Sequence, residues 1–147
     1  MKPIFHFLFI SLLSVISSFS FAEQKIVQGL YEVHYSVFPS TSISPEVAAA
    51  YKLNRSKYRG LVNITPQIKN SDGITQGLKV KVSGQARNLL ANQQNLEFKE
   101  IIECSVIYYL AEFSYSNEEQ FNFKMEVIPD NSNETMNINF DKKFYVD

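Results

Sequence analysis

The segment that decides the fold is Phe121-Asn122-Phe123-Lys124-Met125-Glu126-Val127-Ile128. Its odd-numbered residues are all apolar, and the even-numbered residues between them are polar. Because successive side chains of a β-strand point to opposite sides, this period of two describes a strand with one dry and one wet face. The segment therefore predicts a strand of an antiparallel sheet that packs on a core on one side only.

The same alternation recurs along the chain. It is seen in Tyr31–Val37, Leu78–Ser83 and the C-terminal stretch Met136–Val146, and further strands are expected at Arg59–Ile68, Leu96–Ile102 and Ser105–Tyr115. In the last of these, apolar residues occupy both the odd and the even positions, that is, both parities of the strand. It should therefore be a central strand, paired with Leu96–Ile102. About seven strands at short intervals predict an all-β fold, an antiparallel β-sandwich. It is immunoglobulin-like only in the loosest sense, because the sequence has no cysteine pair and no tryptophan.

One segment, Ser44–Asn54, predicts a short helix. Ser44 can cap its first N–H groups, Pro45 suits the first turn, and Asn54 can take the left-handed conformation that ends a helix. We expect the helix to close one end of the sandwich. Its expected buried stripe consists of Val47, Ala50, Tyr51 and Leu53.

The N-terminus has the features of a signal peptide. Lys2 precedes an apolar run that ends in small residues at Ser20 and Ala22. We expect cleavage after Ala22, so that residues 1–22 are removed and residues 23–147 form a single domain without a stable membrane anchor. The alternative is an uncleaved anchor, but the run is diluted by serines and no basic stop-transfer cluster follows it.

Charge and cysteine content narrow the possible classes. The chain has 14 Lys and Arg, Lys2 among them, against 15 Asp and Glu, and this balance argues against a general nucleic-acid binder. Cys104 is the only cysteine, so no disulfide can form within the chain. Because isoleucines and valines surround it in the sequence, we expect Cys104 to be buried as a small hydrophobe. The alternative is a reactive thiol or a partner in an intermolecular disulfide.

No motif for catalysis, a metal or a cofactor stands out. His34 is the only histidine beyond the leader, and it falls on the polar parity of its strand, so a surface position is expected. A histidine-rich metal site is excluded, and no glycine-rich phosphate loop is present. The acidic residues are scattered, and only a measured separation between two carboxyl groups would make them a candidate hydrolytic pair.

The most unusual local feature is the basic segment Lys52–Arg59, which carries four cations in a slightly acidic protein. If the chain is extended there, Arg55, Lys57 and Arg59 share one face while Tyr58 points inward. With Tyr51 or Tyr58 as a wall, the three cations would bind a small anion or carboxylate. The alternatives are an edge strand protected by its charges, or ion pairs with Glu97, Glu100 and Glu103.

The sequence resembles a family of bacterial proteins, the domain-of-unknown-function family 4426. The stretches that carry the resemblance are Tyr35–Phe38, Ser44–Tyr51, Asn54–Ile64, Val82–Ala86, Ile107–Phe113 and Phe144–Asp147, which together span nearly the whole mature chain. The resemblance implies a Gram-negative host, a periplasmic location and a β-sandwich. It implies no activity.

Three functions remain open. The first is a non-enzymatic interaction module of the cell envelope, which binds another envelope protein or a peptide through a sheet edge or the basic segment. The second is a small-anion binder that uses the basic segment. The third is an enzyme, which needs convergent polar groups in a cleft. We expect the first, with no cofactor.

Overall fold

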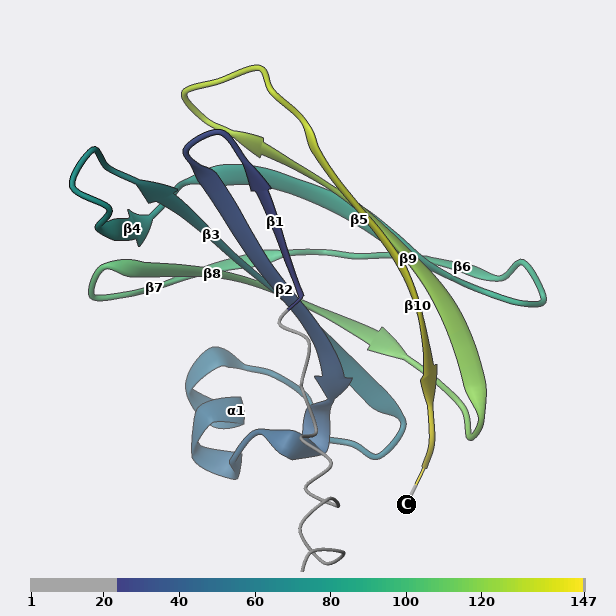
Figure 1. Ribbon diagram of the computed structural model, residues 1–147. Helices are drawn as coiled ribbons and strands as arrows, with labels where there is room; N and C mark the ends of the chain where they lie inside the picture. Colours follow the sequence, from purple (N-terminus) through teal and green to yellow (C-terminus); the bar gives the residue numbers. More distant parts are fainter. Residues whose placement is uncertain (1–23, 147) are drawn as a thin grey trace, which may run out of the picture.

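The computed structural model describes residues 24–146, and in it two antiparallel sheets stack face to face (Figure 1). The expected leader and its cleavage site after Ala22 lie outside the described residues. The strands are β1 (Lys25–Gln28), β2 (Tyr31–Pro39), β3 (Arg59–Lys69), β4 (Thr75–Gly77), β5 (Val80–Asn88), β6 (Gln93–Asn95), β7 (Lys99–Glu103), β8 (Val106–Ser114), β9 (Glu119–Pro129) and β10 (Met136–Phe144). The helices are the 3-10 helix η1 (Ser40–Ser42) and the α-helix α1 (Pro45–Tyr51).

Sheet A has the strand order β1-β2-β3-β8-β7, with β4 added beside β3, and sheet B has the order β10-β9-β5-β6. The all-β fold and the antiparallel sandwich are thus confirmed, and β8 is a central strand paired with β7 as expected. The described residues form ten strands rather than about seven. The additional ones, β1, β4 and β6, have three or four residues each, which is too short for an alternating pattern to show.

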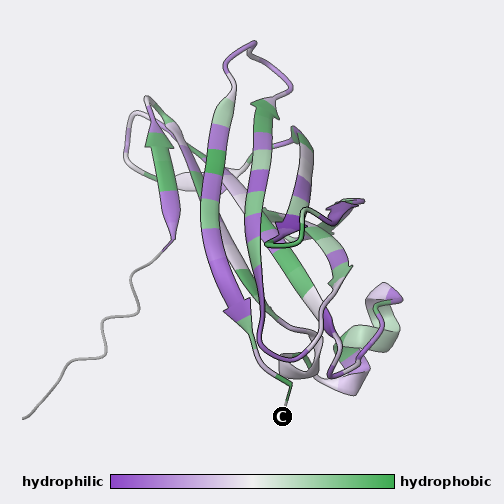
Figure 2. Ribbon diagram, turned by 90° about the vertical axis from the view of Figure 1, so that its right-hand side faces the viewer, coloured by the Kyte–Doolittle hydropathy of each residue, from purple (hydrophilic) through white to green (hydrophobic). Residues whose placement is uncertain are grey.

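The register of the strands turns the alternation of the sequence into a core. Along β9, Phe121, Phe123, Met125 and Val127 are almost completely buried between the sheets. Figure 2 shows the alternation directly, as hydrophobic and hydrophilic residues that follow one another along the strands. Residues from both sheets form one continuous hydrophobic cluster.

Aromatic rings fill the middle of this core. The ring of Phe113 on β8 meets those of Phe121, Phe123 and Phe144 edge to face at centroid distances of 5.2–5.6 Å, a favoured geometry for aromatic pairs. Gly60 on β3 makes room for the same ring, because a Cβ at this position would lie 2.3 Å from Cζ of Phe113. A glycine is therefore needed opposite Phe113.

The helix α1 forms where the sequence predicts it but is shorter. The Ser44 hydroxyl accepts a hydrogen bond from the Val47 N–H at 3.3 Å, and Pro45 occupies the first helical position. The chain leaves the helix at Lys52, whose φ of 54° is left-handed, and the prediction that Asn54 ends the helix is wrong. The N–H of Lys52 satisfies carbonyls of the last turn instead.

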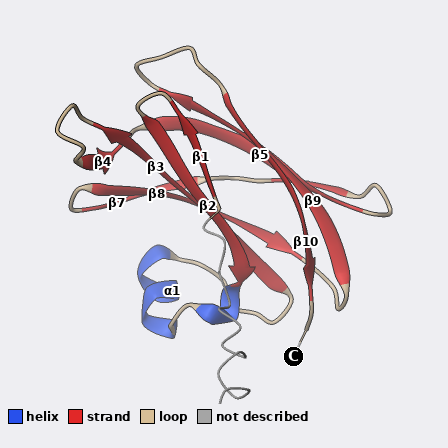
Figure 3. Ribbon diagram, in the orientation of Figure 1, coloured by secondary structure: helices blue, strands red, loops and turns tan. Residues whose placement is uncertain are grey.

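The position of α1 also differs from the expectation. Ala48, Leu53 and Leu61 form a second hydrophobic cluster, separate from the core, on the outer face of sheet A. Figure 3 shows α1 outside the two layers of strands, at the end of the molecule where β2 ends. The helix therefore covers the outside of a sheet and does not plug the space between the sheets.

Cys104 is exposed, and the prediction that it is buried is wrong. It lies in the tight turn between β7 and β8, where its φ of 54° is left-handed. The apolar residues around it in the sequence belong to the two strands, whereas Cys104 lies between them in the turn and belongs to neither. Within residues 24–146, no helix is long and apolar enough to cross a membrane.

Candidate functional site

An apolar groove of about 490 Å³ runs between α1 and the outer face of sheet A. Its floor comes from β3 and β8, one wall from α1, and the other wall from β7. The residues that line it are Phe38, Ile43, Glu46, Val47, Ala50, Tyr51, Leu53, Leu61, Asn63, Ile101, Glu103, Tyr108 and Leu110. A cavity of this size and lining is in the range that binds small ligands or a short apolar segment.

The groove exists because α1 contacts the sheet through only part of its apolar surface. Ala48 and Leu53 fill the contact. Val47 and Ala50 were expected to be buried, but both are exposed and border the groove, with Val47 at 42% exposure. Apolar side chains of the helix thus remain open to a ligand.

Asn63 brings an unusual polar group to the floor of the groove. Its Nδ2 donates a hydrogen bond to Thr65 Oγ1 at 3.2 Å, while its Oδ1 is buried without a partner in the described part of the chain. A buried acceptor without a donor costs about 1–3 kcal/mol. Such groups are rare in folded proteins, and a functional role is one common explanation.

Charged groups lie at the rim of the groove. Glu46 on α1 and Glu103 on β7 line it. A hydrogen bond from its own backbone N–H, together with one from Ser44, lowers the pKa of Glu46, so its carboxylate is ionised at neutral pH. Lys99 lies at the other end of β7, where its ammonium is 3.4 Å from the carbonyl oxygen of Lys52.

The basic segment does not form the extended strand that would align its cations. The Arg59 N–H bonds to the Ser56 carbonyl at 3.1 Å, which makes residues 56–59 a turn. Tyr58 was expected to face inward, but its side chain is 51% exposed. Because the chain turns at Lys57 and Tyr58, the expected single face of three cations is absent.

The side chains of the segment have separate roles. The Arg55 guanidinium donates to the carbonyls of Ile43 at 2.8 Å and Thr41 at 3.1 Å, and so clamps the loop before α1. The Lys57 ammonium lies 5.3 Å from the ring centroid of Tyr58. Of the five proposed ligand-binding residues, Tyr51 alone lines the apolar groove.

The three glutamates that were expected to form ion pairs with the basic segment do not do so. No ion pair joins Glu97, Glu100 or Glu103 to the basic segment among residues 24–146, and Glu100 lies 3.7 Å from Lys79 instead. The carboxylate that does reach the segment is Glu112, which accepts the Asn54 N–H at 2.8 Å. The basic segment thus connects the helix to β3 through backbone contacts.

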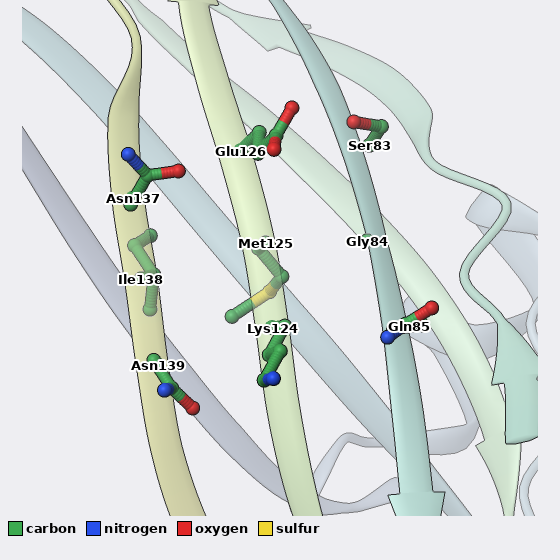
Figure 4. Close-up of a pocket in the computed structure, with 9 residues that line it drawn as sticks. All are labelled: Ser83, Gly84, Gln85, Lys124, Met125, Glu126, Asn137, Ile138 and Asn139. Carbon is green, nitrogen blue, oxygen red and sulfur yellow. The ribbon is translucent and has the colours of Figure 1, made fainter.

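A second hollow, of about 590 Å³, lies on the outer face of sheet B. Figure 4 shows its lining across β5, β9 and β10, with Ser83, Gln85, Lys124, Glu126, Asn137 and Asn139 as the polar members. These side chains lie on the polar parity of their strands, which is the ordinary wet face of a sandwich. The polar lining of this hollow is what the alternation of the sequence predicts for an outer face. The groove on sheet A differs, because its lining on an outer face is apolar.

His34 is paired with an acidic residue of its own strand. Nε2 of His34 lies 2.6 Å from a carboxylate oxygen of Glu32, its neighbour on the same face of β2. Among residues 24–146, no three or more His, Cys, Asp or Glu residues come together as a possible metal site.

The groove was not predicted from the sequence, although one feature of β8 indicates it. Residues of β8 are apolar on both parities, so its outer face must be covered as well as its inner face. The outward residue Leu110 packs against the α1 cluster, while Tyr108 remains part of the open groove. The helix therefore covers one part of this outer face and leaves another part free.

Two comparisons with known proteins agree on one family. The model of the family described as "Domain of unknown function (DUF4426)" matches residues 25–147. The crystal structure of a DUF4426 family protein from Pseudomonas aeruginosa PAO1 is similar with a TM-score of 0.72 and 33% identity, covering 85% of this chain and 96% of that one. No curated protein matches the sequence.

A more distant likeness is to FetP of uropathogenic Escherichia coli strain F11, which was expressed recombinantly in the periplasm of E. coli BL21(DE3). Its structure has a TM-score of 0.58 and 10% identity, covering 84% of this chain and 93% of that one. A copper-bound variant of FetP is similar to the same degree, with 95% of that chain covered. At this identity the likeness shows a shared fold.

Proposed function

This chain belongs to the DUF4426 family, and we propose that it is a non-enzymatic binding module of the bacterial envelope. In this proposal, the groove between α1 and sheet A holds an apolar segment of another envelope protein. The observation that carries the proposal is the open apolar lining of the groove, where Val47, Ala50 and Tyr108 remain accessible beside the buried cluster around Leu61.

The energetics favour a bound segment in the groove. Apolar surface removed from water stabilises a complex by about 25 cal/mol per Å². The groove has a rigid floor, since β3 and β8 are central strands of a sheet, and a pre-formed site limits the entropy lost on binding. The carboxylates of Glu46 and Glu103 at the rim favour a segment with a positively charged residue beside its apolar ones.

A periplasmic location is part of the proposal. It is supported by the expected signal peptide and by the fold that the chain shares with FetP, which was expressed recombinantly in the periplasm. A small-anion site at the basic segment is the weaker candidate, because Nε and Nη2 of Arg55 donate to backbone carbonyls and the turn separates the cations. An enzyme is weaker still, since the groove brings together few polar groups that could react.

The test compares two neighbouring alanines of α1. Ala50 lines the groove and Ala49 does not, while both are exposed. We expect Ala50→Asp to lower the binding of an uncharged apolar dye such as Nile red at least tenfold. Ala49→Asp should leave it unchanged, with similar melting temperatures for the two variants. The same pair would then be compared in cells, with a photo-crosslinking amino acid at Val47 to capture the bound envelope protein.

A control crosslinker at Lys81, an exposed position on the outer face of sheet B, should give no product of the same mass. The proposal requires one discrete adduct from Val47 that disappears in the Ala50→Asp background. Equal products from both crosslinking positions, or adducts that do not depend on Ala50, would contradict it.

A further inference from the structure

The strand β7 is an open edge of sheet A. It pairs with β8 on one side, and within residues 24–146 no strand pairs with its other side. Its sequence is Lys99-Glu100-Ile101-Ile102-Glu103, with two adjacent isoleucines at its centre. An open edge with a hydrophobic centre tends to pair with another strand.

The other edges are better protected. In β10, Lys142 falls on the inward parity together with Phe140 and Phe144, and an inward-pointing charge is a common device against edge pairing. The edges β1 and β6 have four and three residues, and those of β6 are all polar. Adjacent apolar residues lie at the centre of β1 as well as of β7, but β1 has four residues and β7 has five, so β7 offers the longer apolar edge of the two.

The residues of β7 on the outer face of sheet A are complementary to themselves. Ile101 and Glu103 line the groove on that face, and Lys99 lies on the same parity. If two β7 strands pair antiparallel about Ile101, each Lys99 faces Glu103 of the second copy, and the two Ile101 side chains face each other. Opposite charges and apolar pairs directly across two strands each contribute about 0.2–1 kcal/mol.

We propose that this chain forms a two-fold symmetric dimer in which β7 pairs antiparallel with β7 of a second copy, centred on Ile101. Sheet A of each copy then continues into the other. A parallel arrangement would place Lys99 beside Lys99 and Glu103 beside Glu103, where like charges repel. The charges of β7 therefore specify both the direction and the register of the pair.

The inner parity of β7 is compatible with this arrangement. There Glu100 of each copy lies across from Ile102 of the other. The Glu100 carboxylate accepts the Tyr109 hydroxyl at 2.8 Å and lies near Lys79, so it is held within its own subunit. Ile102 has 55% of its surface exposed in the single chain, and the second strand covers part of it. This burial adds an apolar contribution to the pairing.

The dimer has a consequence for binding. Because the two-fold axis of an antiparallel strand pair is perpendicular to the sheet, both outer faces lie on the same side of the joined sheet. The two grooves then flank the axis. A partner with two apolar segments would be held at both, which raises its apparent affinity without new contacts. The dimer itself does not depend on what the groove binds.

The experiment uses charge reversal and analytical ultracentrifugation of the chain without its leader. Lys99→Glu alone and Glu103→Lys alone each place two like pairs in the interface and should weaken dimerisation about tenfold or more. Mixing these two variants, or combining both changes in one chain, restores opposite pairs and should restore the dimer. Recovery on mixing would not occur if either residue only stabilised its own subunit.

A covalent trap makes the test independent of a weak affinity. In a Cys104→Ser background, Ile101→Cys should form a disulfide-linked dimer under mild oxidation, because the two residues lie directly opposite each other. Lys99→Cys in the same background should not, because its two copies lie at opposite ends of the paired strands. Equal crosslinking of both variants, no crosslinking at Ile101→Cys, or no recovery when the charge variants are mixed would overturn the proposal.

Discussion

The ammonium of Lys142 on β10 donates a hydrogen bond to the carbonyl oxygen of Val37 on β2, and so joins the two sheets beyond the end of β1. Nζ of Lys142 also lies 5.5 Å from the ring centroid of Phe144. A charged group from the inward parity of one edge thus satisfies a backbone group at the edge of the facing sheet. The contact closes this side of the sandwich, whereas no strand of residues 24–146 pairs with the outer edge of β7.

A pH dependence follows from the burial of Lys142. Desolvation lowers the pKa of this ammonium, so between the lowered value and the usual 10.5 the folded protein binds fewer protons at this site than the unfolded chain. The free energy of unfolding contributed by Lys142 must then rise with pH through that window. Urea unfolding at several pH values should show this rise in the wild type and not in Lys142→Met. A parallel pH dependence in both proteins would contradict it.

Tyr109 is a second link between the sheets, and its removal has a predictable cost. Its hydroxyl accepts the Val80 N–H of sheet B at 3.0 Å and donates to Glu100 at 2.8 Å. Tyr109→Phe leaves the Val80 N–H without this partner and should lower the free energy of unfolding by about 1–3 kcal/mol. The measurement is urea unfolding at pH 7, with the exposed Tyr145→Phe as control.

The same hydroxyl gives an effect of opposite sign at high pH. Burial, followed by the nearby Glu100 carboxylate, raises the pKa of Tyr109 to about 12, against a usual value of 10. Between these two values the folded state holds the proton more tightly than the unfolded chain, so stability must fall as pH rises. Tyr109→Phe should lose this part of the alkaline decline while keeping the contribution of Lys142.

The fold was predictable from the sequence because most strands have one wet face. Alternation along β2, β9 and β10 places their inward residues correctly, and the apolar character of β8 on both parities correctly makes it central. Lys142 is an exception to the alternation of the C-terminal strand. It lies on the apolar parity between Phe140 and Phe144, and a charge at such a position is a sequence signal for a buried contact or a protected edge.

The site was much less predictable, because it depends on contacts between distant segments. The density of charge made Lys52–Arg59 the predicted binding site, but a local cluster of cations does not determine how the chain turns. The turn at Lys57 and Tyr58 and the clamp formed by Arg55 arise from backbone groups that only the folded structure brings near. The groove needs α1, β3, β7 and β8 together, and no single stretch of sequence contains it.

Cys104 should react rapidly with thiol reagents in the native protein. Its side chain is exposed in the turn between β7 and β8, and it is the only cysteine of the chain. Ellman's reagent should therefore modify one thiol per chain without denaturant, at a rate close to that in urea. A thiol that reacts only after unfolding would show that the turn is packed against other residues. Cys104→Ser should retain the melting temperature of the wild type to within about 2 °C, since exposed substitutions change stability little.

Asn63→Leu should stabilise the protein by about 1 kcal/mol, because it removes a buried oxygen that has no donor from the apolar floor of the groove. The hydrogen bond from Asn63 to Thr65 is lost as well, but the Thr65 hydroxyl can rotate toward another acceptor. Thr65→Val provides the matched comparison: it leaves the Asn63 amide in place without its acceptor and should be destabilising. Urea unfolding of both variants decides the sign. A decrease in the stability of Asn63→Leu would contradict this. It would mean that Oδ1 of Asn63 accepts a hydrogen bond from water in solution, and that water enters the groove.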